Sequence, residues 1–206
     1  MSTLVSLLLV VAAYLIGAVP WGFVLGKLNG IDVRTQGSGG TGTTNTLRLL
    51  GWKIAATVFV LDFLKGLVPV LVARWLDAPT WVVAAVGVAT VVGHCWPVYI
   101  GFKGGKGMAT SGGAALGLAW WLLVLLPPMI GIVYLTRYVS LASICAAVAG
   151  PLILIVASSL GYLPWSWTIA TCCMGAIIVW QHRSNIQRLL NGTERKFGTH
   201  EAPSTA

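Results

Sequence analysis

Apolar runs of about 20 residues fill most of this chain, and a helix needs roughly that length to cross the hydrocarbon core of a bilayer. We find no sustained alternation of apolar and polar residues, the pattern that indicates strands of a membrane barrel. Hydrophobic residues make up 57% of the sequence and charged residues only 9%, whereas soluble domains carry about 25% charged residues. We therefore predict an all-α integral membrane protein.

The predicted spans are separated by short polar breaks. They cover Leu4 to Leu25, about Trp52 to Leu71, Thr80 to Ile100, Leu141 to Leu160 and Pro164 to Trp180. The segment Thr110 to Thr136 is too short for two full spans yet has basic residues at both ends, so we expect a hairpin of short, tilted helices broken at Pro127-Pro128. We expect a bundle of about seven transmembrane helices, or five full spans if the hairpin is only re-entrant.

The thirteen Lys and Arg residues lie almost entirely in the breaks between apolar runs. Basic residues favour the cytoplasmic side, so the net charge of +8 indicates orientation rather than nucleic-acid binding. Lys27 and Arg34 after the first run predict the amino terminus outside and the carboxyl terminus in the cytoplasm. Without a basic leader or a small-residue cleavage site, we interpret the first run as a retained span. The four cysteines lack metal-ligand spacing, and we predict no metal site.

A polar, glycine-dense segment from Gly37 to Arg48 separates the first two runs. Besides Arg48, its candidate ligand residues are Gly37, Ser38, Gly39, Thr41, Gly42, Thr44 and Asn45. Glycine lets successive backbone N–H groups converge on one point, while hydroxyls and the arginine add donors, so the segment suits an oxyanion such as phosphate. A flexible connector between two spans has a similar composition, and this segment alone does not separate the two interpretations.

A second glycine-rich loop precedes the proline-containing segment. Its candidate ligand residues are Lys103, Gly104, Gly105, Lys106 and Gly107. The loop fails the Walker pattern because Ile100 and Gly107 stand where that pattern needs Gly and Ser or Thr, so we do not expect ATP binding. Lys106 and the surrounding backbone amides still suit a smaller phosphate. The alternative is a basic anchor at the cytoplasmic membrane surface.

Further candidate residues follow the later spans. Ser140 and Ser143 follow Arg137, and His182 and Asn185 share a helical face at i, i+3 spacing. All four polar segments are predicted to lie on the cytoplasmic side, as a site for anionic substrates requires.

Three polar residues lie within or at the end of apolar runs. Asp62 and Lys65, at i, i+3 spacing, are predicted to pair because unpaired charges at that depth are costly. We favour a structural bridge over a role in the site. His94 is typical of a packing residue more than of a substrate ligand.

Three motifs occur in chain order. They are Arg34-x-x-Gly37-Ser38-Gly39-x-x-Gly42-x-Thr44-Asn45-x-x-Arg48, then Gly93-His94-x-x-Pro97 with Phe102-Lys103-Gly104-Gly105-Lys106-Gly107-x-Ala109-Thr110, then His182-x-x-Asn185-x-x-Arg188-Leu189 with Gly192-x-Glu194. Together they resemble the acyl-phosphate:glycerol-3-phosphate acyltransferase family of bacterial inner membranes, the PlsY type, over about residues 17 to 196. Gly40 and Thr43 depart from the Asn and Ala that are usual in that family.

The resemblance implies one membrane-embedded acyltransferase domain over residues 1–206, with a short cytoplasmic tail from about 197. It implies transfer of a fatty acyl group from acyl phosphate to the 1-hydroxyl of glycerol 3-phosphate, giving lysophosphatidic acid and phosphate, the first step of phospholipid synthesis. The implied partners are these two substrates and the lipid bilayer of the inner membrane, with the site facing the cytoplasm. Because acyl phosphate is already activated, no cofactor or metal is implied. The oligomeric state stays open.

The resemblance also suggests roles. Ser38, the loop amides and Asn45 would hold the acyl phosphate, and Arg48 would neutralise the leaving phosphate. Lys106 would bind the phosphate of glycerol 3-phosphate. The hydroxyls of glycerol 3-phosphate would be oriented by Ser140 or Ser143, His182 and Asn185. The expected catalytic residues are Ser38, Arg48, His182 and Asn185; either His182 or the donor phosphate would take the proton.

A transporter of a small phosphate ester is the alternative function. Broken helices and intramembrane charges such as Asp62 and Lys65 also occur in transporters. The absence of an internal repeat and a site confined to one face favour the enzyme.

Overall fold

The computed structural model describes residues 1–198, and within that range the chain forms nine α-helices and two short 3-10 segments. In order these are α1 (Thr3–Gly17), α2 (Trp21–Leu28), α3 (Thr43–Trp75), α4 (Thr80–Cys95), η1 (Val98–Ile100), α5 (Met108–Leu118), η2 (Trp120–Leu125), α6 (Leu126–Thr136), α7 (Val139–Ser159), α8 (Trp165–Gln181) and α9 (Arg183–Leu190). The all-α prediction is confirmed for this range. Most of the predicted tail, residues 199–206, lies outside the described residues.

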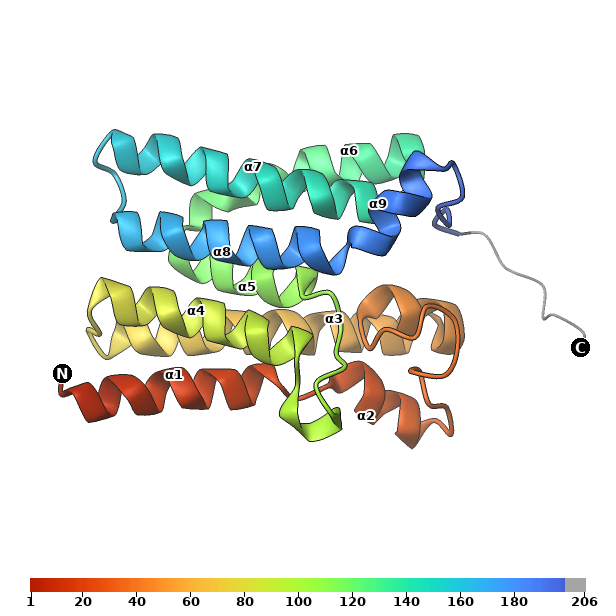
Figure 1. The fold of residues 1–206 in the computed structure, drawn as a ribbon, viewed down its shortest axis with the longest axis horizontal. Helices are drawn as coiled ribbons and strands as arrows, with labels where there is room; N and C mark the ends of the chain where they lie inside the picture. The colour runs from red at the N-terminus through yellow and green to blue at the C-terminus, as the bar shows by residue number, and fades with distance from the viewer. Residues whose placement is uncertain (199–206) are drawn as a thin grey trace, which may run out of the picture.

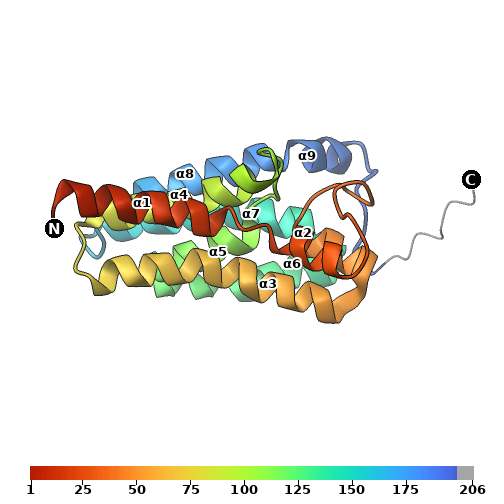
Figure 2. The same cartoon turned by 90° about the horizontal axis from the view of Figure 1, so that it is seen from below.

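The helices lie roughly along one axis in an elongated bundle (Figure 1, Figure 2). α1 packs against α4, α3 against α5, α7 against α8, and α4 against α8. Glycines allow the closest crossing: a Cβ at Gly66 of α3 would clash with the Thr110 carbonyl, and one at Gly113 of α5 with the Phe63 carbonyl. Such small residues at crossings are typical of membrane helices, where tight packing replaces the hydrophobic driving force.

Four helical stretches among the described residues are long and apolar enough to cross a membrane. They are Thr3–Leu28, Thr43–Trp75, Thr80–Ile100 and Val139–Ser159. The apolar helices α5, α6 and α8 are shorter. The count of about seven transmembrane helices and the orientation of the termini therefore stay predictions.

The first candidate span, Thr3–Leu28, covers the predicted run from Leu4 to Leu25 and consists of two helices. α1 ends at Gly17 and α2 begins at Trp21, with Pro20 between them. Proline has no N–H to donate, which favours a helix start over continuation of a helix. This joint lets α2 follow its own direction beneath the first polar loop (Figure 1).

The first polar segment is only partly a loop, so its prediction as a loop up to Arg48 is wrong. Gly42 has the extended backbone of an N-cap, and Thr43 already begins α3. Arg48 therefore projects from the second turn of a helix. Gly51, with φ +78°, leaves the helical conformation and separates these first turns from the long apolar part of α3.

The short hairpin exists, but the prolines do not break it. The chain leaves the helical conformation at Ala119, at the end of α5, and passes through η2. Pro127 and Pro128 lie in the first turn of α6, where a missing N–H costs no hydrogen bond. α5 and α6 run in opposite directions, and the chain turns back before it reaches the end of the bundle where α3 meets α4 (Figure 1).

Candidate functional site

The polar segments gather at the end of the bundle away from the amino terminus. The loop between α2 and α3, the loop before α5, the connection from α6 to α7, and α9 all lie toward that end (Figure 1, Figure 2). Segments far apart in the sequence thus meet in one region.

Asn45 fixes the conformation of the first loop. Its Oδ1 accepts a hydrogen bond from the Ser38 backbone N–H at 2.8 Å. Its Nδ2 lies within donating distance of three loop carbonyls, those of Val33, Gln36 and Gly40. With its side-chain groups engaged in the loop and only 2% of the residue exposed, the Asn45 side chain positions Ser38.

The glycines of the first loop are needed for this conformation. Gly37 has φ +62° and Gly39 has φ +70°, values that suit glycine. A Cβ at Gly37 would also clash with Asn45 Oδ1. Ser38 lies between them in the chain and is exposed.

The start of α3 offers donors to an anion. The N–H groups of Thr43, Thr44 and Asn45 lie in the first turn, where a helix has no internal acceptor for them. Gly42 supplies no side-chain cap. Thr43 Oγ1 is buried without a hydrogen-bond partner among the described residues. Because a helix N-terminus also carries partial positive charge, this region suits a phosphate group.

Thr41 anchors the loop rather than exposing its hydroxyl. The residue is buried, and its carbonyl lies against Gly22 of α2, where a Cβ would clash with it. α2 thus serves as the platform on which the first loop rests.

The second loop is attached to the end of α4 through its glycine amides. Gly104 N–H donates to the Cys95 carbonyl and Gly105 N–H to the His94 carbonyl, both at 3.2 Å. A Cβ at Gly105 would clash with His94 Nε2. The predicted cradle of amides around Lys106 is therefore not formed by these two glycines, whose role is close packing on α4.

The remaining residues of the loop differ in exposure. Gly107 has φ +80° and immediately precedes α5. Lys103 is exposed, whereas Lys106 is partly buried. Lys106 is thus the loop lysine that faces the interior of the site.

Lys106 belongs to a hydrogen-bond network with α9 and the tail. Its Nζ donates to Asn185 Oδ1, and Asn185 Nδ2 donates to Glu194 Oε1 at 2.6 Å. Glu194 also accepts from Ser140 Oγ and from Arg188 Nε, both at 2.7 Å. These three donors hold the pKa of Glu194 below its usual value, against the effect of burial. One carboxylate therefore connects the second loop, α7 and the tail.

Positive charge is concentrated around Lys106. Burial lowers the pKa of Lys106 to about 8, with further lowering by Arg188 and Arg48 and an opposing effect of Glu194. Arg48 of α3 is thus close enough to act on Lys106 of the second loop. Three cations around one carboxylate create a field that favours a phosphate dianion.

His182 is held as a neutral ring. The residue is buried, and its Nδ1 lies 2.8 Å from the Ile178 carbonyl. A carbonyl only accepts, so Nδ1 carries the proton and Nε2 presents a lone pair. Burial lowers the pKa of His182 to about 4, and Lys106 contributes to the lowering. His182 therefore suits accepting a hydrogen bond more than serving as a strong base.

The two candidate serines are not equivalent. Ser140 bonds Glu194, as described, whereas Ser143 Oγ donates to the Val139 carbonyl of its own helix at 2.9 Å. The hydroxyl of Ser143 is thus engaged inside α7, and Ser140 is the one that belongs to the network.

Glu194 and Arg188 are functional candidates that the site prediction left out. Both were recognised only as members of a motif. The signal in the sequence was that Glu194 is the only acidic residue in the basic stretch 183–198.

An apolar chamber of about 310 Å³ opens beneath this site, lined by residues of α3, α5, η2, α6, α7 and α8. Met108 and Ile178 line it. Met108 follows the Lys106 loop by one residue, and the Ile178 carbonyl bonds His182. One end of the chamber therefore adjoins the polar site. Ser111 and Gly112 also line the chamber, whose other walls are almost entirely apolar.

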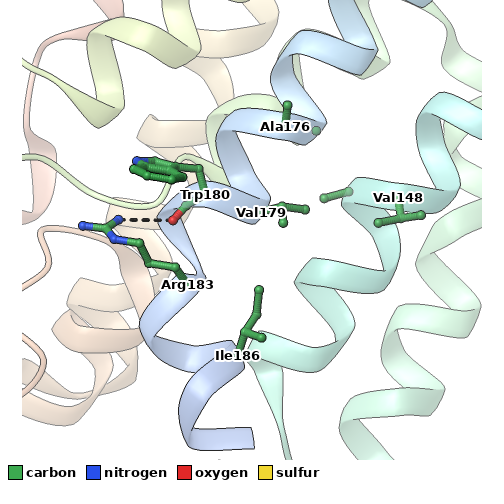
Figure 3. A pocket seen from close by; sticks show the side chains of 8 residues that line it. Val148, Ala176, Val179, Trp180, Arg183 and Ile186 are labelled. Carbon is green, nitrogen blue, oxygen red and sulfur yellow. Dashed lines mark hydrogen bonds between the residues drawn. The ribbon is translucent and has the colours of Figure 1, made fainter. Parts of the chain in front are cut away.

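A separate shallow groove of about 500 Å³ runs along α7, α8 and α9 (Figure 3). Val148, Val179 and Ile186 line it, and Arg183 lies beside Trp180, donating to the Trp180 carbonyl at 3.1 Å. Ala147 and Gly175 line both the groove and the chamber. The α7–α8 contact thus separates the two spaces.

Comparisons with known proteins agree on one family. The family model described as glycerol-3-phosphate acyltransferase matches residues 7–192. The chain is 42% identical to the glycerol-3-phosphate acyltransferase of Rubrobacter xylanophilus over 95% of this chain and 96% of the relative. It is 44% identical to that of Aquifex aeolicus over 93% and 99%.

Two solved structures are also similar. Both are of PlsY (YgiH), described as an integral membrane glycerol 3-phosphate acyltransferase. The glycerol 3-phosphate form matches with a TM-score of 0.89 and 45% identity, and covers 94% of this chain and 96% of that one. The lysophosphatidic acid form matches with a TM-score of 0.86 and 44% identity over the same shares.

Proposed function

The chain belongs to the glycerol-3-phosphate acyltransferase family, and from this membership we propose that it uses acyl phosphate as the acyl donor. It is an integral membrane glycerol-3-phosphate acyltransferase of the PlsY type. In the proposed reaction, the 1-hydroxyl oxygen of glycerol 3-phosphate attacks the acyl carbon, and the bond from that carbon to the phosphate oxygen breaks. The products are lysophosphatidic acid and phosphate, and the phosphate leaves with the hydroxyl proton.

One observation carries the proposal. Two separate phosphate-compatible elements, the start of α3 with Ser38 and Arg48, and Lys106 with its α9 network, lie at the same end of the bundle above an apolar chamber. A reaction between two phosphates, one of them carrying a fatty chain, requires this combination.

The start of α3 is the proposed donor site. The first-turn amides and the exposed Ser38 would hold the phosphate of acyl phosphate. Arg48, one turn further along, would face the bridging oxygen, where negative charge develops as the phosphate leaves. Preorganised donors at such a position are worth about 3 to 4 kcal/mol of transition-state stabilisation.

The Lys106 network is the proposed acceptor site. Lys106 would pair with the phosphate of glycerol 3-phosphate, and Asn185 and Ser140, both held by Glu194, would lie against its hydroxyls. His182 Nε2 would accept from the hydroxyl that attacks and orient it. Because the pKa of His182 is only about 4, we assign the proton to the departing phosphate of the donor.

The apolar chamber is the proposed site of the acyl chain. Its end near Met108 and Ile178 adjoins the polar site, so a chain lying there places its activated carbon next to His182. We further propose that the protein is one domain in the bacterial inner membrane, amino terminus outside, with the site facing the cytoplasm. The basic residues between the apolar runs support this orientation.

Turnover by the purified protein tests the proposal. The protein in detergent is given glycerol 3-phosphate with acyl phosphate or with acyl-CoA of the same chain length, and released phosphate and lysophosphatidic acid are measured. We expect equal amounts of both products with acyl phosphate and none with acyl-CoA. Turnover with acyl-CoA but not with acyl phosphate would contradict the assignment of acyl phosphate as the donor. Folded protein that turns over neither donor would favour the transporter.

A further inference from the structure

A buried cluster of ionisable side chains lies inside the bundle beneath the site and has no part in the proposed chemistry. Lys65 Nζ is 2.8 Å from Asp62 Oδ1, and His94 Nδ1 is 3.6 Å from the same oxygen. All three side chains are at least 95% buried. The pairing of Asp62 with Lys65 was predicted, and the third member, His94 of α4, is added by the fold.

Lys65 connects the cluster to the first loop through α2. Lys65 Nζ donates to the Val19 carbonyl at 2.7 Å, in the joint between α1 and α2. The Val19 carbonyl also accepts from the Trp21 N–H at 3.2 Å, so Lys65 adds a second, charged donor just beyond the carboxyl end of α1, where a cation is favoured. The contact fixes the direction of α2, and α2 carries Gly22, against which the Thr41 carbonyl rests.

His94 connects the cluster to the second loop through Gly105. Asp62 faces one nitrogen of His94, and the other nitrogen, Nε2, lies where a Cβ of Gly105 would clash. Gly105 N–H also donates to the His94 carbonyl. The position of His94 therefore determines where Gly105 lies, and Lys106 is the next residue.

We propose that Asp62, Lys65 and His94 are positioning residues that fix the two substrate loops relative to each other. The proposal rests on the proposed function, because it takes the first loop as the donor site and Lys106 as the acceptor site. A buried charged cluster is costly to form and is not needed for stability when neutral residues of the same shape fill the space. Holding two loops in register for transfer between two phosphates gives the cluster a role.

The test removes both charges together. In Asp62→Asn/Lys65→Met no charge is left unpaired, so the variant is expected to fold and to unfold within a few degrees of wild type. At saturating substrates we expect kcat to fall at least tenfold, with a several-fold higher KM for both acyl phosphate and glycerol 3-phosphate. The single variant Lys65→Arg keeps the positive charge and N–H donors at this position. Its kcat should therefore fall less than that of the double variant.

A control and a second variant keep the test decisive. Thr168→Val removes two buried hydrogen bonds that join α7 to α8 near the opposite end, one with Ser158 Oγ at 2.6 Å and one to the Leu154 carbonyl at 3.1 Å. It should change stability and leave kcat and KM unaltered. His94→Gln tests the same proposal if the double variant does not fold, and it should raise both KM values. Wild-type kinetics in the variant that folds, or a rise in KM for one substrate only, would overturn the proposal. Lack of turnover by the wild type would instead contradict the proposed function.

Discussion

Lys106 donates a hydrogen bond to Oδ1 of Asn185, 79 residues further along the chain, and this contact ties the loop before α5 to α9. Asn185 can present its oxygen to Lys106 because its Nδ2 donates to Glu194 at 2.6 Å. Glu194 thus determines which way the amide faces. The acceptor site therefore depends on a carboxylate that need not touch the substrate.

The first prediction concerns this carboxylate. Glu194→Gln keeps the shape of the side chain but replaces a charged acceptor of three hydrogen bonds by a neutral amide. Hydrogen bonds to charged groups contribute about 1.5 to 3 kcal/mol, so we expect the KM for glycerol 3-phosphate to rise at least tenfold, with a smaller change in the KM for acyl phosphate. Asp77→Asn, a carboxylate change at the far end of α3, is the matched control. Equal effects on both substrates would contradict the assignment of this network to the acceptor.

The charge of Lys106 predicts how kcat/KM for glycerol 3-phosphate depends on pH. Its pKa is about 8, so Lys106 loses its charge as the pH rises through that value, and attraction for a phosphate is lost with it. We expect kcat/KM for glycerol 3-phosphate to fall above about pH 8 with a slope of one proton, measured above pH 7, where the substrate phosphate, with a pKa near 6, is fully ionised. In Lys106→Arg the fall should disappear, because arginine stays charged. The same fall in the variant would show that another group titrates.

The variant His182→Ala tests which group accepts the proton of the attacking hydroxyl. A general base contributes about 10² to 10⁴-fold to the rate, whereas a residue that only orients a hydroxyl contributes less. We expect His182→Ala to lower kcat a few-fold and to raise the KM for glycerol 3-phosphate. A loss of kcat of a thousandfold or more, with KM unchanged, would make His182 the essential base and contradict proton transfer to the donor phosphate.

The chamber makes a prediction about acyl-chain length. Gly112 lines it, and a Cβ at this position meets no other atom within 4 Å, so Gly112→Leu fills space without displacing the backbone. Each methylene that loses its buried place costs about 0.8 kcal/mol. In Gly112→Leu, the ratio of kcat/KM for long-chain acyl phosphates to that for short-chain acyl phosphates should fall at least tenfold. Gly131→Leu in α6, also open at its Cβ, should leave the ratio unchanged, and an equal ratio in both variants would place the acyl chain elsewhere.

Much of this site was predictable from local sequence, and the rest depended on packing. The spacing of Asp62 and Lys65 fixed their pairing because i, i+3 neighbours share a helix face. Nothing local indicated that His94 joins them, since that contact depends on how α4 crosses α3. The polarity of Thr43 to Arg48 predicts a loop, although hydroxyl residues also suit the first turn of a helix, where the structure places them. The role of Asn45 in bracing the loop, and that of Glu194 as a shared acceptor, depend on hydrogen-bond partners that only the fold defines.

The kcat of Arg48→Ala tests the central claim most directly. Arg48 projects from the start of α3 and lowers the pKa of Lys106, and it is the residue assigned to the charge that develops on the leaving phosphate. At saturating acyl phosphate and glycerol 3-phosphate, we predict a fall in kcat of about 10² to 10³-fold, with partial activity in Arg48→Lys. Arg183→Ala, which removes an arginine from the shallow groove along α7, α8 and α9, should retain normal turnover. A kcat close to wild type in Arg48→Ala would contradict the assignment of the start of α3 as the donor site.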